Sequence, residues 1–144
     1  MGQTLLYHVV MGTGLALAID KNAPHAGGQL ILAYPNSADA DQQWAFVFYP
    51  ATQASILYNI GRNLFAAPAQ ITKGAPVVLF PLVTQYSGAN TWQILSAKSA
   101  AIRPQQDTGL NMNALGSSWP PETKIGIWDW GGGSPNEVWT STLL

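Results

Sequence analysis

Three tryptophans stand at nearly equal intervals along this chain, at Trp44, Trp92 and Trp139. The intervals are 48 and 47 residues, so the 144 residues divide almost into thirds. A period of this length indicates an internal repeat, in which each copy is one structural unit that cannot bury its apolar face alone. The copies must therefore pack around a shared core, and any binding site is expected once per copy, at equivalent positions.

Each tryptophan closes a run that carries the same marks in the same order. A leucine precedes it by 29, 28 and 29 residues, and a second aromatic residue precedes it by 10, 12 and 11 residues. The leucines are Leu15, Leu64 and Leu110, and the aromatic residues are Tyr34, Phe80 and Trp128. Unrelated core residues have no reason to share these spacings. We therefore expect repeats at about 1–50, 51–97 and 98–144, with the closing tryptophans in the core.

The pattern favours strands over helices throughout. No stripe of helical period is sustained, and short apolar runs bounded by turn residues recur at 5–11, 15–19, 30–34, 44–49, 55–60, 77–82, 92–95, 125–130 and 138–143. Gly14 and Gly109 precede matched runs, and Gly27 and Gly74 fall at matching places before the run with the second aromatic residue. Four strands in each of three copies predict an all-β protein, a single β-trefoil domain over residues 1–144.

Composition excludes several classes of function. Only 9% of the residues are charged and the net charge is −1, which leaves no basic patch for nucleic acid. With no cysteine and two histidines, neither a disulfide framework nor a metal site is expected, and Asp39-Ala40-Asp41 is interpreted as a solvated loop. No apolar run is long enough to span a membrane. The N-terminus lacks the positive lead of a secretory signal, so we expect a cytoplasmic protein or one released without a signal peptide.

The segment Gln42-Gln43-Trp44 resembles the Gln-x-Trp motif that marks the ricin-B-type β-trefoil lectins. The other two copies keep the tryptophan and replace the glutamine, as Asn90-Thr91-Trp92 and Glu137-Val138-Trp139. The resemblance implies that the glutamine supports the adjacent loop and that the second aromatic residue of each copy is a platform for a sugar. The Asp that this family places after the second-strand leucine is missing, because Ala18, Ala67 and Asn113 stand at the matching positions. Asp20 is expected to take over that role in the first copy.

A sugar has an apolar face of C–H groups and a rim of hydroxyls, so its site needs an aromatic wall and a few polar groups. Candidates in the first copy are Tyr34 with Asp20, Asn36, Asp41 and Gln42. Candidates in the third copy are Trp128 and Trp130 with Asn113, Asn136 and Glu137. Strand alternation puts both indoles on one side, and one of them is expected in the core. The second copy, with Phe80, Asn90, Ala67 and Ala89, is the weakest candidate.

The sequence therefore predicts a carbohydrate-binding lectin without enzymatic activity or a cofactor. Galactose and N-acetylgalactosamine glycans are the ligands that the resemblance implies. One alternative is a proteinase inhibitor on the same fold, acting through a protruding loop at 117–121 or 104–109. Another is a toxin component or structural module whose sites have decayed. Because 47% of the residues are apolar and few are charged, a homo-oligomer is a further expectation.

Overall fold

The computed structural model describes residues 4–94 and 100–144. Within these ranges it contains twelve strands and one short 3-10 helix, η1 (Ala40–Gln42). The strands are β1 (Tyr7–Met11), β2 (Ala16–Ile19), β3 (Leu30–Ala33), β4 (Ala45–Tyr49), β5 (Ala54–Asn59), β6 (Leu64–Pro68), β7 (Val77–Pro81), β8 (Trp92–Ile94), β9 (Ile102–Pro104), β10 (Leu110–Ala114), β11 (Ile125–Asp129) and β12 (Trp139–Leu143). No helix in the described ranges is long and apolar enough to cross a bilayer.

Strands β6, β9 and β10 were not among the apolar runs singled out in the sequence, although β10 does follow Gly109, which precedes a matched run. Strand β9 has three residues, and Arg103 and Pro104 are two of them. Strand β10 carries two asparagines, Asn111 and Asn113, and buries both of them. Polar residues inside a buried strand hide the apolar pattern that indicates one. Leu95, the predicted end of the run at 92–95, lies outside the described residues.

Six strands form a closed ring. Strand β1 pairs with β12, β4 with β5, β5 with β8, and β8 with β9, all antiparallel. Two isolated bridges complete the circle, because Tyr7 pairs with Trp44 and Ala100 pairs with Trp139. The ring therefore runs β12–β1–β4–β5–β8–β9 and back to β12, a closed barrel without a free edge.

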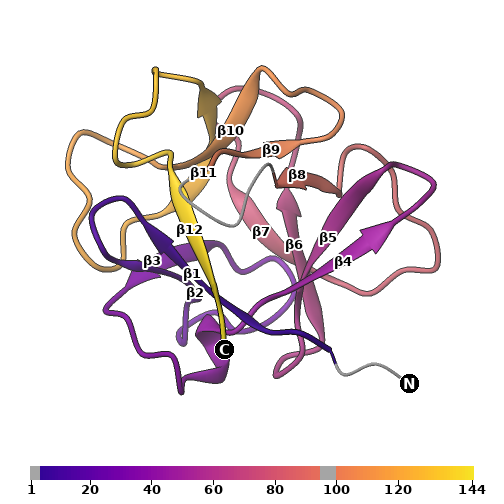
Figure 1. Cartoon of the computed structure of the whole chain (residues 1–144), viewed down its shortest axis with the longest axis horizontal. Helices are drawn as coiled ribbons and strands as arrows, with labels where there is room; N and C mark the ends of the chain where they lie inside the picture. The colour runs from indigo at the N-terminus through magenta and orange to yellow at the C-terminus, as the bar shows by residue number, and fades with distance from the viewer. Residues whose placement is uncertain (1–3, 95–99) are drawn as a thin grey trace.

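The other six strands make three hairpins, β2–β3, β6–β7 and β10–β11. Each hairpin touches the other two through one bridge, at Gln29–Val78, Pro76–Gly126 and Ile31–Lys124. Figure 1 shows β1 beside β12, with the chain returning at its C-terminus to the barrel where it began. A six-stranded barrel capped by a triangle of hairpins is the β-trefoil, as the sequence predicted.

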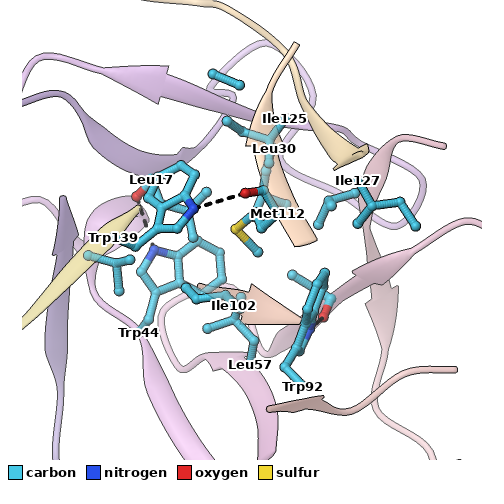
Figure 2. Packing of buried hydrophobic residues seen from close by; sticks show 14 of the residues in the cluster. Leu17, Leu30, Trp44, Leu57, Trp92, Ile102, Met112, Ile125, Ile127 and Trp139 are labelled. Carbon is cyan, nitrogen blue, oxygen red and sulfur yellow. Dashed lines mark hydrogen bonds between the residues drawn. The ribbon is translucent and has the colours of Figure 1, made fainter. Parts of the chain in front are cut away.

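The three closing tryptophans occupy equivalent places in the core. Trp44, Trp92 and Trp139 are 0%, 0% and 1% exposed, which confirms the prediction that they are buried. Each indole N–H donates to a backbone carbonyl of the second strand of its own copy, two residues after the leading leucine. The acceptors are Leu17, Ala66 and Met112, at 3.0, 2.8 and 3.1 Å. Figure 2 shows the three indoles around a cluster that includes Leu57, Ile102 and Ile127.

The three copies have equivalent strands and tryptophans, but the exact residues at which each copy begins and ends stay a prediction. The first boundary, near residue 50, follows β4 and precedes β5. The second, at residue 97, lies outside the described residues. The equivalence of the copies therefore rests on the strands and tryptophans rather than on the boundaries.

Candidate functional site

Two cavities lie at equivalent positions in the first and third copies. The first, of about 520 Å³, lies over β2 and β3 and is walled by Tyr34 together with Asp20, Lys21 and Asp39. The second, of about 420 Å³, lies over β10 and β11 and is walled by Trp128 together with Asn113 and Asn136. Ala18 lines the first cavity at the place that Asn113 takes in the second. Both cavities thus combine one aromatic side chain with a polar rim.

Tyr34 follows β3 directly and is 74% exposed, which leaves its ring free for a ligand. Asp20 follows β2, and its Oδ1 accepts a hydrogen bond from the backbone N–H of Asn22 at 2.9 Å. Its Oδ2 lies 3.7 Å from the Lys124 ammonium, a loose ion pair, and the Asp20 side chain is 16% exposed. Asp20 and Tyr34 therefore stand together as the sequence predicted.

Two predicted first-copy residues, Gln42 and Asn36, instead build the loop that frames this cavity. Gln42 lines the cavity but is buried: its Nε2 donates to the Tyr34 carbonyl, and its Oε1 accepts from the Asn36 backbone N–H and contacts His8 Nε2. Asn36 does not line the cavity, and its Oδ1 accepts from the Ala38 backbone N–H, as in a turn. The support role that the resemblance gave to Gln42 is thus observed, whereas neither residue has a free polar group facing a ligand.

Asp41 belongs to an ion-pair network and not to the cavity wall. Its carboxylate accepts from Arg62 Nε at 2.9 Å and from Lys21 Nζ at 2.8 Å. The interpretation of residues 39–41 as a solvated loop was wrong, since Asp39 caps helix η1 and Asp41 is buried. The Arg62 hydrogen bond lowers the pKa of Asp41 against the opposing effect of burial. The same carboxylate, through its hydrogen bond, raises the pKa of Lys21 and fixes that ammonium at the cavity rim.

In the third copy, the structure brings together Trp128, Asn113 and Asn136. Trp128 is 44% exposed, and Lys73 Nζ lies 4.5 Å from the centroid of its ring and 2.8 Å from Asp129. Asn136 Nδ2 donates to the Ala114 carbonyl at 3.1 Å, and no described residue donates to its Oδ1. Asn113 is largely buried against the Asn111 side chain, 2.6 Å away. No charged side chain lines this cavity among the described residues.

Neither Trp128 nor Trp130 is a core residue, so the expectation that one of them is buried was wrong. Trp130 is 40% exposed and lies one residue beyond the end of β11. It does not line the cavity of Trp128. The Arg103 guanidinium carbon lies 5.2 Å from the centroid of the Trp130 ring. Alternation places both indoles on one side only while the strand continues, and β11 ends at Asp129, one residue before Trp130.

The loop after Trp130 is fastened by the residue that replaces glutamine in the third copy. The buried carboxylate of Glu137 accepts hydrogen bonds from the backbone N–H groups of Gly131, Gly133 and Ser134, at 2.7 to 3.1 Å. Burial raises the pKa of Glu137, but the backbone donors outweigh it and the pKa is lowered. The backbone of the three glycines at 131–133 is therefore held around the Glu137 carboxylate.

In the second copy the platform residue, Phe80, is only partly exposed. Phe80 stacks on buried Phe65 with their ring centroids 5.4 Å apart, and Ala67 is buried. The Asn90 Oδ1 accepts a hydrogen bond from the backbone N–H of Ser87 at 2.6 Å. This arrangement agrees with the expectation that the second copy is the weakest candidate.

Each cavity also takes a residue from the neighbouring hairpin, which reasoning within single copies missed. Gly74 lines the third-copy cavity, and Glu122 lines the first-copy cavity. Both have a positive φ, 87° and 73°, as does Gly27 at 91°. Their backbone N–H groups donate to the opposite hairpin in the same way, to Ile127, Leu32 and Leu79 respectively. Glu122 therefore has a left-handed conformation at the position where the other two copies have Gly27 and Gly74. The replacement of that glycine by Glu122 was a signal that an alignment of the three copies could have found.

Left-handed backbone is costly for a residue other than glycine, and such strain persists mostly where function requires the side chain. The exposed carboxylate of Glu122 stands at the wall of the cavity that contains Tyr34 and Asp20. The first cavity therefore has Glu122 as a third acidic residue beside Asp20 and Asp39.

The loops proposed for proteinase inhibition are fastened to the body of the protein. Trp119 is half-buried against the core, and its indole N–H donates to the Gly116 carbonyl at 3.0 Å. In the other loop the Gln105 and Gln106 backbone N–H groups bond to Thr91 and Gly88. An inhibitory loop needs an extended backbone free to pair with an enzyme. These contacts disfavour the inhibitor alternative.

Within the described ranges, no group of three or more His, Asp or Glu side chains is placed to hold a metal ion.

No protein-family model matches this sequence, and no curated protein matches it. Solved structures do match. The designed threefold-symmetric protein ThreeFoil superposes with a TM-score of 0.82 at 17% identity, covering 96% of this chain and 99% of its own. The Rhizoctonia solani agglutinin gives 0.82 at 15% identity, covering 100% and 98%. The Macrolepiota procera ricin B-like lectin, solved with lactose, gives 0.76 at 16% identity, covering 98% and 96%. The chain therefore has the β-trefoil fold that these lectins and the designed protein share.

Proposed function

We propose that this protein is a carbohydrate-binding lectin with two sites, one over Tyr34 in the first copy and one over Trp128 in the third. The observation that carries the proposal is the recurrence of a cavity with an exposed aromatic side chain and a polar rim at equivalent places in two copies. The ricin B-like lectin of the same fold was solved with lactose, which supports galactose-type ligands. The protein binds its ligand without chemical change and uses no cofactor.

The two sites differ in charge, and so they rank the same sugars differently. The first cavity has Asp20, Asp39 and Glu122 as acceptors and Lys21 as donor. The third cavity offers the amide groups of Asn113 and Asn136. Carboxylates accept hydrogen bonds from sugar hydroxyls more strongly than amides do. We expect tighter binding at the first site and wider tolerance at the third. Two sites on one body also raise the avidity for multivalent glycans, more so if the protein self-associates.

The test is calorimetric titration of lactose into the wild type, Tyr34→Ala, Trp128→Ala and the double variant. Each single change should weaken its own site about thirtyfold, because covering the apolar face of a sugar contributes roughly 2 kcal/mol. The double variant should bind nothing measurable. Phe48→Ala is the matched control, since Phe48 is an exposed aromatic residue outside both cavities. Equal affinities for wild type and double variant would contradict the proposal.

Replacing Glu122 with glycine should separate binding from stability. Relief of the left-handed backbone should leave the free energy of unfolding unchanged or raise it by up to about 1 kcal/mol. Loss of a carboxylate acceptor should weaken lactose binding at the first site about tenfold, measured in the Trp128→Ala background. Gly74→Ala at the equivalent position is the reverse control and should destabilise the fold, because φ there is +87°. An E122G variant that binds like its parent would remove Glu122 from the site.

A further inference from the structure

The arginine on β9 has an environment unlike that of the other cations. Of the five lysine and arginine residues in the described ranges, four form ion pairs with carboxylates; they are Lys21, Arg62, Lys73 and Lys124. Arg103 is half-buried and pairs with no carboxylate in that part of the chain. Its Nε is buried without a hydrogen-bond partner. A partly desolvated guanidinium without a carboxylate partner interacts with an anion more strongly than a fully solvated one.

The indole beneath Arg103 is fixed in place and still accessible. The guanidinium carbon lies 5.2 Å from the centroid of the Trp130 ring, and Trp130 is 40% exposed. The Gly133 backbone lies along the same indole, since a Cβ built there would be 3.7 Å from Trp130 Cζ2. Glu137 holds that loop through its backbone N–H groups, so the Glu137 carboxylate is already occupied. The pair therefore presents an oriented cation beside an apolar ring.

We propose that Arg103 and Trp130 form a subsite for an acidic sugar residue, beside the neutral cavity of Trp128; this inference rests on the proposed lectin function. A guanidinium presents parallel N–H donors that match the oxygens of a carboxylate or a sulfate ester. The adjacent indole covers the C–H face of the same sugar ring. Trp130 follows Trp128 by two residues, so the backbones of the two residues lie at most about 7 Å apart, which is the scale of one monosaccharide. A short glycan can therefore place a neutral unit on Trp128 and an acidic unit on Trp130.

The experiment compares lactose, 3′-sialyllactose and 3′-sulfolactose by calorimetry in Tyr34→Ala protein, in which the third-copy site is isolated. We expect the sialylated or the sulfated probe to bind about tenfold tighter than lactose at low salt, the gain of one charge-assisted pair. The preferred probe identifies the acidic group as carboxylate or sulfate. In Arg103→Gln the ratio of acidic to neutral affinity should fall to about one. The matched control Lys124→Gln removes the same charge elsewhere and should keep the ratio.

Failure of this inference is distinguishable from failure of the proposed function. If lactose binds and neither acidic probe is preferred, or if Arg103→Gln keeps the preference, the subsite is overturned while the lectin proposal stands. If none of the three probes binds, both are overturned. If Arg103→Gln does not fold, the indole N–H resonance of Trp130 in unaltered protein decides. That resonance, assigned from its loss in Trp130→Phe, must shift with an acidic probe and not with lactose, and any other response overturns the subsite.

Discussion

Replacing Trp44 with alanine should lower the free energy of unfolding by about 3–5 kcal/mol, the cost of removing a large aromatic side chain from a packed core. The indole is fully buried, and its N–H donates to the Leu17 carbonyl at 3.0 Å. Truncation therefore leaves both a cavity and a buried carbonyl without its donor. In thermal unfolding followed by circular dichroism, the melting temperature should fall by roughly 10 °C or more.

The threefold design provides its own replicates for this experiment. Trp92→Ala and Trp139→Ala should give losses of similar size, because those indoles are equally buried and make the equivalent hydrogen bond. Trp130→Ala is the matched surface control and should cost less than about 1 kcal/mol. A Trp44→Ala variant that melts with the wild type would show that this indole does not anchor the core.

Glu137→Ala should cost about 2–3 kcal/mol at pH 7, because three backbone N–H groups lose a charged acceptor. Its depressed pKa makes that contribution dependent on pH. The group binds a proton less readily in the folded state, so its stabilisation is fully present above its ordinary pKa of about 4.5. The stabilisation is lost as pH falls through the lower pKa of the folded state. Urea unfolding of wild type and variant at pH 7 and at pH 2.5 measures the difference.

Glu137→Gln is the control that separates charge from shape. Gln42 supports the corresponding loop of the first copy as a neutral amide, so a glutamine fits this role. We expect Glu137→Gln to lose roughly half as much stability as Glu137→Ala and to show little of its pH dependence. A difference between wild type and Glu137→Ala that stays the same at both pH values would contradict a charged carboxylate in the loop.

The spacing of aromatic residues predicted the fold and both platforms. Trp44 is buried and Tyr34 exposed because each keeps its place in the repeat, and a repeated pattern reports repeated burial. The same logic explains the failure at Trp130. Alternation holds only while the strand continues, and β11 ends at Asp129. The local pattern therefore identified the rings that line the two cavities, Tyr34 and Trp128, but not how each aromatic ring faces solvent.

The polar half of the sites was harder to predict because hydrogen bonding depends on partners far along the chain. Asp41 looked free in the sequence, yet Arg62, 21 residues later, engages its carboxylate. Asn36 was expected to contact the sugar, but its side chain accepts a hydrogen bond within a turn. Glu122 was overlooked because it enters the first cavity from the third copy. A search limited to each copy cannot find residues that the folded trefoil brings in from the next one.

The sequence by itself determined a threefold β-trefoil with a tryptophan at the centre of each lobe. Burial of apolar surface depends on residue type and spacing, and both are written along the chain. Only the tertiary structure decided which polar groups remain free for a ligand. Asp20 and Glu122 remain accessible at a cavity, Asp41 and Glu137 are taken up by internal donors, and Arg103 is left without a carboxylate partner in the described part of the chain. The physical reason is that a donor or acceptor is free for a ligand only if no group brought near it by folding already bonds to it.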